Sequence, residues 1–280
     1  MNEIKLPQGT IRYRESGEGP PIVFVHGLLV DGRLWRKVTP LLEERFRCIV
    51  PDLPLGSHVT PMKPDADLSP PGLARVIAGF MQALELRDVT LVANDTGGAI
   101  SQITAANHPK RIGRLVLTNC DAFENFLPPA FRPLQWAAKV PGMLTGMMEG
   151  MRFAPMRRLP IAFGWLIKKD FAAAPTREWV DPFLSDRAIR RDTIKVLKGI
   201  DPRYTMEAAE KLRTFDRPTL LAWAVEDRFF KLSYAERLAN TIQGARLERI
   251  DDSYTFVSED QPEQLAKLIA EFARPPVAAS

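Results

Sequence analysis

The stretch "TLVANDTGGAI" (residues 90–100) decides the fold that we expect for this chain. Its first half is apolar, as in a buried strand, and two glycines follow the Asn94-Asp95 pair after one intervening residue. When a strand turns directly into a helix, the residue at the apex lies at the carboxyl edge of a parallel sheet, where α/β proteins place their functional sites. The apex residue here is Asp95. The sequence therefore predicts a carboxylate at the functional edge of the sheet.

The residues around Asp95 suit a tight turn from strand to helix. Gly97 and Gly98 let the helix approach the strand closely. Ala93, the next smallest residue, stands where the pattern G-x-nucleophile-x-G has its first glycine. The simpler interpretation is that Asp95 only caps the helix, because a negative charge is favourable at a helix N-terminus.

The rest of the chain alternates short apolar runs with helical periodicity, which predicts a mostly parallel, doubly wound α/β sheet. Apolar residues repeat at three- and four-residue spacing after Ser69, which predicts a capped helix there. Asp260 and Glu263 have the spacing of a capping box for the last helix. The strand candidates are residues 21–27, 47–54, 89–95, 114–120, 219–227 and 245–251.

One long segment, residues 121–213, interrupts this alternation, because it carries no strand signal and is rich in proline, methionine and tryptophan. We expect it to form a helical cap. The α/β core is then expected to consist of residues 1–120 and 214–275, followed by a disordered tail at residues 276–280.

Three side chains of this segment are candidate pocket residues: Trp136, Met147 and Trp165. Methionine is flexible and polarizable and tryptophan is flat and apolar, so both suit a pocket that adapts to an apolar guest. The alternative is that these side chains form the core of the cap.

The composition of the 280-residue chain, with 45% hydrophobic and 26% charged residues, is typical of a globular protein with a full core. The net charge of +4 comes from basic residues scattered among acids, so we expect no nucleic-acid partner. The N-terminus lacks the pattern of a signal peptide, and no apolar run reaches the ~18 residues of a membrane span. We therefore expect a cytoplasmic monomer or homodimer without a membrane partner. Cys48 and Cys120 each lie in an apolar run, which favours free buried thiols.

Four further segments follow one another in an informative order. "FVHG" (residues 24–27) and "PDLP" (51–54) end two strand candidates, "LVLTNCD" (115–121) precedes the helical segment, and "WAVED" (223–227) ends a late strand in Asp227. Together with the Asp95 turn, this order resembles the α/β-hydrolase superfamily over nearly the whole chain. The aspartate at the turn makes it most similar to the haloalkane dehalogenase and epoxide hydrolase branch. The resemblance implies an α/β-hydrolase fold with a helical cap, a small hydrophobic organic substrate and no cofactor or metal.

The resemblance also implies a mechanism. In that branch an ionised aspartate attacks an alkyl carbon, and a histidine then activates water to hydrolyse the resulting ester. Asp95 matches the nucleophile, and at the ordinary aspartate pKa of about 4 it is ionised at neutral pH. Asp227 matches the carboxylate that orients the histidine, and the backbone N–H groups of Leu28 and Thr96 match an oxyanion hole.

The histidine itself is missing, because the segment "DDSYTFVSEDQPEQL" (residues 251–265) carries Thr255 at its expected place. A threonine hydroxyl does not take a proton from water at neutral pH, so the triad is atypical. Three histidines lie elsewhere. We expect His26 beside the pocket with a hydrogen-bonding role and His108 at the surface. His58 is weighed as a substitute base in the pocket against a surface or hydrogen-bonding role.

Other departures concern the substrate. Dehalogenases of this branch commonly hold the halide with a tryptophan after the nucleophile or an asparagine after "HG", but Thr96 and Leu28 occupy these positions. Epoxide hydrolases commonly use two cap tyrosines, whereas residues 121–213 contain only Tyr204. Tyr254 is an alternative proton donor, and Asn94 is a further candidate pocket residue.

Three hypotheses remain open. The first is a hydrolase that uses Asp95 as a nucleophile, with His58 or another group activating water. The second is a non-hydrolytic lyase, isomerase or cyclase that uses Asp95 as a general acid or base, for which a missing water-activating histidine is an advantage. The third is an inactive relative that only binds a small ligand. Asp121 is a rival carboxylate to Asp227, and a second carboxylate near Asp95 would raise one pKa.

Overall fold

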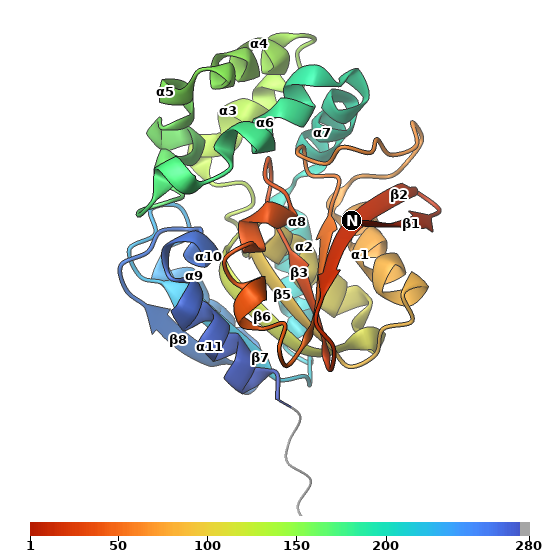
Figure 1. Cartoon of the computed structure of the whole chain (residues 1–280), viewed down its shortest axis with the longest axis vertical. Coiled ribbons are helices and arrows are strands. Elements are labelled where there is room, and N and C mark those ends of the chain that lie inside the picture. Colours follow the sequence, from red (N-terminus) through yellow and green to blue (C-terminus); the bar gives the residue numbers. More distant parts are fainter. Residues whose placement is uncertain (275–280) are drawn as a thin grey trace, which may run out of the picture.

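The computed structural model describes residues 1–274 and has an eight-stranded sheet at its centre (Figure 1). The strand order is β1-β2-β4-β3-β5-β6-β7-β8, and β3 to β8 run parallel to one another. This confirms the predicted mostly parallel α/β sheet. The strands are β1 (Asn2–Leu6), β2 (Gly9–Ser16), β3 (Pro21–Val25), β4 (Arg47–Asp52), β5 (Val89–Asp95), β6 (Ile112–Cys120), β7 (Thr219–Ala224) and β8 (Arg246–Ile250). The tail predicted to be disordered, residues 276–280, lies outside the described residues.

All six predicted strands are present, but β1 and β2 are not among the predictions. They form an antiparallel hairpin at one edge of the sheet, where β2 also pairs antiparallel with β4. Most residues of β1 and of β2 are partly or fully exposed, and they include several charged side chains. They therefore lack the continuous apolar run by which buried parallel strands are recognised.

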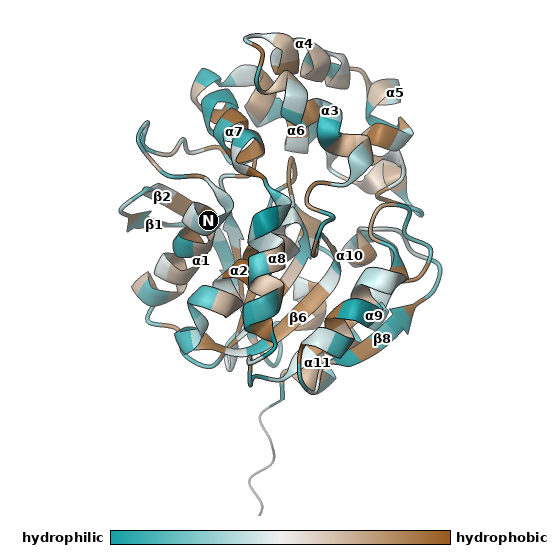
Figure 2. Ribbon diagram, turned by 180° about the vertical axis from the view of Figure 1, so that it is seen from behind, coloured by the Kyte–Doolittle hydropathy of each residue, from teal (hydrophilic) through white to brown (hydrophobic). Residues whose placement is uncertain are grey.

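Helices cover both faces of the sheet. α1 (Pro70–Ala83), α2 (Thr96–Asn107) and α8 (Pro202–Leu212) lie together on the face seen in Figure 2. α11 (Pro262–Phe272) and the short turns at Gly32–Trp35 and Thr39–Leu41 lie on the opposite face. The remaining core helices are α9 (Leu232–Thr241) and α10 (Val257–Asp260). None of the helices within residues 1–274 is long and apolar enough to cross a membrane.

One of the two predicted helix caps is confirmed. Ser69 caps α1, because its side-chain oxygen accepts a hydrogen bond from the Gly72 N–H at 3.3 Å. The predicted capping box at Asp260 is wrong, since α11 begins at Pro262. The Asp260 carboxylate instead accepts the backbone N–H groups of Lys168 and Lys169, at 2.8 to 3.0 Å, and thereby ties the helical segment to the core.

The segment between β6 and β7 carries a group of helices over the carboxyl edge of the sheet (Figure 1). We refer to residues 121–200 as the helical insertion. α8, which the sequence assigned to the cap, packs against α2 of the core, so we propose that the insertion ends before α8. The helices of the insertion are α3 (Arg132–Ala137), α4 (Met143–Glu149), α5 (Ala154–Arg157), α6 (Thr176–Ser185) and α7 (Arg187–Gly199).

Candidate functional site

Asp95 ends β5 and begins α2 in a backbone conformation that side-chain-bearing residues rarely adopt, with φ 55° and ψ −139°. A positive φ at a non-glycine residue is strained and is characteristic of functional turns. The turn depends on small neighbours. A Cβ added at Gly97 would lie 2.2 Å from the His26 carbonyl oxygen, and one added at Gly27 would lie 2.4 Å from Oδ2 of Asp95. β3 and β5 therefore bring the "HG" turn directly against the Asp95 carboxylate.

Two further groups hold the Asp95 carboxylate. Oδ1 accepts a hydrogen bond from the backbone N–H of Thr96 at 2.6 Å. The Thr96 hydroxyl lies 3.4 Å from this same oxygen and 3.2 Å from Oδ2 of Asp121. The hydroxyl therefore connects two carboxyl groups that lie at the ends of neighbouring parallel strands.

Three buried carboxyl groups influence one another at this edge of the sheet. Burial raises the pKa of Asp95 to about 7, and the charge of Asp227 also raises it. Burial and the charge of Asp95 raise the pKa of Asp121 well above its ordinary value. Burial raises the pKa of Asp227 to about 6, although its Oδ1 accepts the backbone N–H groups of Phe229 and Phe230 at 2.7 and 3.0 Å. Within residues 1–274, no group of three or more His, Cys, Asp or Glu side chains has a metal-binding arrangement.

A cavity of about 190 Å³ lies between Asp95 and the helical insertion. For comparison, an apolar cavity of about 150 Å³ accommodates benzene. Asp95 is the only one of the sixteen lining residues with a polar side chain. The others are Leu28, Leu29, Leu127, Phe131, Leu134, Met147, Met148, Gly150, Met151, Met156, Leu159, Ile161, Ala162, Phe163 and Leu166.

A family model described as "alpha/beta hydrolase fold" matches residues 20–262, a range that includes the Asp95 turn. The chain belongs to the α/β-hydrolase family. It is 30% identical over 274 residues to a haloalkane dehalogenase of Agrobacterium fabrum, covering 91% of this chain and 85% of the relative. It is 27% identical over 285 residues to a cis-3-alkyl-4-alkyloxetan-2-one decarboxylase of Xanthomonas campestris pv. campestris, covering 95% and 93%.

Solved structures agree on the fold. A haloalkane dehalogenase from Bradyrhizobium elkani superimposes with a TM-score of 0.79 at 22% identity, covering 97% of this chain and 96% of that one. An α/β-hydrolase-fold protein from Burkholderia ambifaria gives a TM-score of 0.82 at 22% identity, covering 96% and 97%. The haloalkane dehalogenase relative at 30% identity supports the haloalkane dehalogenase branch for this α/β-hydrolase, as the sequence predicts.

The loop in which relatives of this branch are expected to carry histidine is held in place in this α/β-hydrolase. The carbonyl oxygen of Thr255 accepts a hydrogen bond from Nδ2 of Asn94 at 2.8 Å, and the next residue, Phe256, donates its N–H to the Leu166 carbonyl at 2.8 Å. The Thr255 side chain is fully buried beside Asp227, and its hydroxyl lowers the pKa of that carboxyl group. The loop therefore contacts both β5 and the helical insertion, but it presents no imidazole to Asp95.

His58 and His26 both use their ring nitrogens away from Asp95. His58 is buried, with Nε2 at 3.4 Å from Oδ2 of Asp192 on α7 and Nδ1 accepting the Gly56 N–H at 3.4 Å. It thus lies at the junction of core and insertion and is not one of the cavity-lining residues. His26 accepts the Leu53 N–H on Nε2 at 2.8 Å, and its Nδ1 lies 2.9 Å from the Gly27 carbonyl. Burial lowers the pKa of His26, so its neutral form fits this pair of hydrogen bonds.

The other predicted pocket residues differ in position. Met147 lines the cavity. Trp136 is 65% exposed, so it lies on the surface of the insertion and not inside it. Trp165 packs against Phe229 and under the Arg228 guanidinium, and the hydroxyl of Tyr254 accepts a hydrogen bond from Arg228 at 3.1 Å.

Asn94 is not one of the cavity-lining residues, and the two N–H groups of its Nδ2 are shared among Thr118 Oγ1, the Asn119 carbonyl and the Thr255 carbonyl, which lie 2.8 to 3.0 Å away. Apart from Leu28, which was named for its backbone N–H, sequence reasoning named none of the leucine and phenylalanine residues of the cavity wall. The only signal that indicated the wall was the methionine-rich run at residues 143–156, which supplies Met147, Met148, Met151 and Met156.

Proposed function

We propose that this protein is an enzyme that acts on a small hydrophobic substrate in the cavity beneath the helical insertion, with Asp95 as the nucleophile. The observation that carries the proposal is that Asp95 is the single polar side chain in the cavity wall. An apolar wall positions a hydrophobic substrate by excluding water, so the bound substrate lies against the only group with which it can react.

In the first step, one oxygen of the Asp95 carboxylate attacks the alkyl carbon that bears the leaving group, which in a ring ester is the alkyl carbon bonded to the ring oxygen. A carbon–oxygen bond forms, the bond to the leaving group breaks, and the bonding electrons depart with that group. The other oxygen becomes the carbonyl oxygen of the resulting ester. The Thr96 N–H, which already donates to Oδ1, is suited to hold that carbonyl oxygen during hydrolysis.

In the second step, water adds to the ester carbonyl and must lose a proton. Asp227 is our candidate acceptor, since its pKa of about 6 leaves it mostly ionised at neutral pH. Its Oδ2 is buried and has no hydrogen-bond partner within residues 1–274. Asp227 is held by the Phe229 and Phe230 N–H groups and is not one of the cavity-lining residues, so we expect slow turnover.

The substrate class follows from the cavity and from the relatives. Halide release lacks support, because Leu28 and Thr96 supply no side-chain donor of the kind that dehalogenases use. Epoxide opening is also weakly supported, because the Tyr204 hydroxyl is hydrogen-bonded to Arg203 at 2.6 Å on α8, outside the insertion. The decarboxylase relative acts on an alkyl-substituted oxetanone, which is a strained ring ester. We propose a small, ester-like hydrophobic electrophile as the best candidate.

A second candidate is a non-hydrolytic lyase, isomerase or cyclase with Asp95 as general acid or base. It is favoured by Thr255 at the place of the water-activating histidine and by the Asp95 pKa of about 7, which suits proton transfer near neutral pH. The third hypothesis, an inactive relative that only binds a small ligand, predicts neither a covalent adduct nor a reaction product.

Intact-protein mass spectrometry after incubation with hydrophobic epoxides, alkyl halides and strained or activated esters tests the proposal. We expect an adduct on the wild type that is absent from Asp95→Asn and that turns over faster in Thr255→His. Product formed without an adduct, with deuterium incorporated from D2O in an Asp95-dependent manner, would favour the second candidate. Ligand binding without adduct or product across the panel would contradict both enzymatic proposals.

A further inference from the structure

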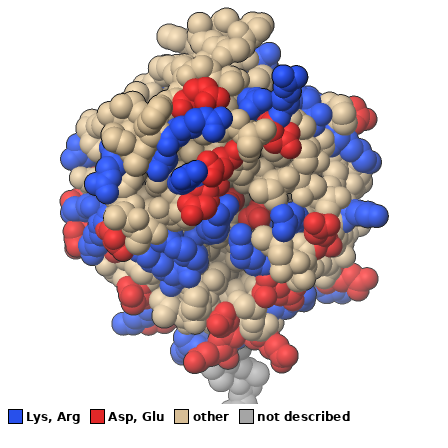
Figure 3. All heavy atoms as spheres, turned by 45° about the horizontal axis from the view of Figure 1, so that its top comes forward, with Lys and Arg blue, Asp and Glu red and all other residues tan. Residues whose placement is uncertain are grey.

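A large apolar surface covers the outside of the helical insertion. Its members belong to α3, α4, α5 and the turns that follow them, which contact one another in chain order. Figure 3 shows a mostly uncharged region at the top of the molecule, where the insertion lies. We define the exposed apolar surface as Trp136, Val140, Met143, Met147, Phe153, Met156, Leu159 and Ile161, whose exposed fractions range from 41% to 68%. Apolar patches of this kind on a soluble protein mark binding sites.

The exposed apolar surface is continuous with the cavity. Met147, Met156, Leu159 and Ile161 line the cavity and are also exposed to solvent. The cavity that contains Asp95 is therefore bordered on its outer side by the same side chains that form the surface. These shared side chains are apolar, so the outer border of the cavity carries no charged group from this set.

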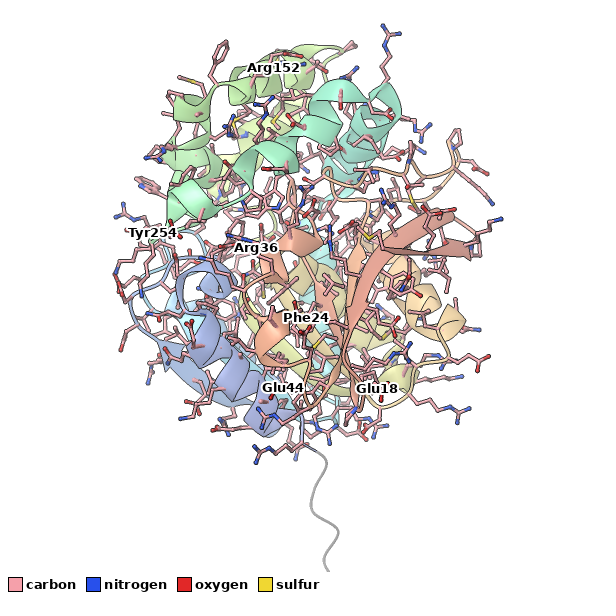
Figure 4. The ribbon with its side chains drawn as sticks, in the orientation of Figure 1. Glu18, Phe24, Arg36, Glu44, Arg152 and Tyr254 are labelled. Carbon is pink, nitrogen blue, oxygen red and sulfur yellow. The ribbon has the colours of Figure 1, made fainter. Side chains whose placement is uncertain are left out.

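The charges around the surface are predominantly positive. Residues 132–161 contain five Arg or Lys side chains and one acidic residue, Glu149, which forms an ion pair with Arg152; Arg157 is buried. Arg132, Lys139 and Arg152 are exposed. Figure 4 places Arg152 on the insertion, whereas the labelled acidic residues Glu18 and Glu44 lie at the opposite end of the molecule. Exposed tryptophan and phenylalanine beside arginine and lysine are typical of surfaces that bind to the interface of an anionic membrane.

We propose that the exposed apolar surface docks on an anionic lipid bilayer, with its apolar side chains in the interface and its basic side chains on the headgroups. Pairing of two copies through this surface is disfavoured, because it would bring the same basic side chains of each copy together. This mode is peripheral and needs no membrane-spanning helix. It revises the expectation from sequence that the protein has no membrane partner. Access of substrate from the bilayer to Asp95 rests on the proposed function, but the docking does not.

Vesicle sedimentation of the full chain without substrate tests the docking. Vesicles of phosphatidylcholine alone are compared with vesicles that also contain phosphatidylglycerol. We expect binding to the anionic vesicles, reduced by at least about tenfold in the variant Trp136→Ser, Val140→Ser, Phe153→Ser, none of which lines the cavity. The variant Arg132→Glu, Lys139→Glu is expected to lose about tenfold on anionic vesicles only.

Matched controls lie elsewhere on the surface. Leu41→Ser, Val59→Ser, Met206→Ser removes three apolar side chains that are 44%, 44% and 38% exposed, and Arg45→Glu, Lys267→Glu reverses two exposed charges at a distance from the insertion. Both controls should retain binding within about twofold. The proposal is overturned if the wild type binds neither vesicle or if the controls lose binding as the test variants do. It is also overturned if light scattering shows a dimer that the Trp136 variant converts to a monomer, because the surface is then an interface between copies.

Discussion

At the scale of single residues, the ionisation of Asp95 decides what the site can do. A nucleophile or a general base must be ionised, but burial raises the pKa of Asp95 to about 7 and so favours its neutral form. The backbone N–H and the hydroxyl of Thr96 lower the pKa, while the charge of Asp227 raises it. The balance leaves a carboxyl group that changes its charge near neutral pH.

We therefore expect activity to rise as the pH increases through about 7, since the ionised form accumulates. Thr96→Val removes the hydroxyl that lowers the pKa of Asp95, so the rise should move to higher pH. At pH 6.5 the variant should be about threefold less active than the wild type, with little difference at pH 9. A pH–rate profile checks this, and Thr96→Ser, which keeps the hydroxyl, is the control. Equal profiles for all three proteins would contradict a role for the hydroxyl.

The same raised pKa predicts how stability depends on pH. In the folded protein, Asp95 holds its proton more tightly than it does in the unfolded chain. The free energy of unfolding therefore falls as the pH rises from about 4 to about 7. Asp95→Asn removes this buried ionisable group. We expect the variant to be more stable than the wild type at pH 8, on the order of 2 kcal/mol, and to show a smaller gain at pH 4.

Urea unfolding at the two pH values measures this difference. Asp201→Asn is the control, because Asp201 is an exposed cap of α8 whose Oδ1 accepts the Arg203 N–H at 2.9 Å, and asparagine caps equally well. If the Asp95→Asn variant is less stable than the wild type at pH 8, burial of the ionised Asp95 carboxylate does not destabilise the folded protein as we expect.

At the scale of elements, the junction of β5 and α2 was predictable because its requirements are local. An apolar run, an apex residue and two glycines within eleven positions specify the strand, the turn and the helix. The hydrogen bonds of Asp260 and the edge strands β1 and β2 could not be predicted in this way. The Asp260 carboxylate accepts the N–H groups of Lys168 and Lys169, 92 and 91 positions away, and such long-range partners leave no local pattern.

The close approach at this junction predicts how replacing Gly97 by alanine changes the stability of the protein. Gly97→Ala places a Cβ against the His26 carbonyl and should destabilise the protein by several kcal/mol or shift the turn and abolish activity. Gly79→Ala, in the interior of α1, places its Cβ where no atom lies within 4 Å and should stabilise by about 0.5–1 kcal/mol. Thermal unfolding of the two variants measures the contrast, and a Gly97→Ala protein as stable and active as the wild type would show that the close approach is not required.

At the scale of the whole molecule, the insertion is attached to the core by buried polar contacts between distant residues. Asp192 of α7 accepts the Met62 N–H at 2.8 Å and faces His58, while Asp260 and Phe256 hold the other side of the insertion. The sequence indicated both His58 and a helical insertion, but their contact spans 134 positions and could not be predicted. For the same reason the sequence did not distinguish Trp136, at the surface, from Met147, in the cavity wall.

Asp192→Ala removes one of these attachments and leaves the Met62 N–H without its partner. We expect a loss of roughly 2–4 kcal/mol and faster hydrogen exchange in α7. Asp181→Ala breaks only an exposed pair with Arg177 on α6 and should change stability by less than about 0.5 kcal/mol. Similar losses in the two variants would mean that the Asp192 contacts do not hold the insertion in place.

The hydrogen bonds of Asn94 have a further consequence, for how such sites evolve. One amide holds the Thr255 loop against the strand that ends in Asp95, so the backbone at position 255 stays in register whatever its side chain is. Under the proposed mechanism, a lineage that exchanges threonine and histidine there changes how fast the Asp95 ester is hydrolysed, without rebuilding the scaffold. Selection can thus move between slow and fast turnover through a change at a single position.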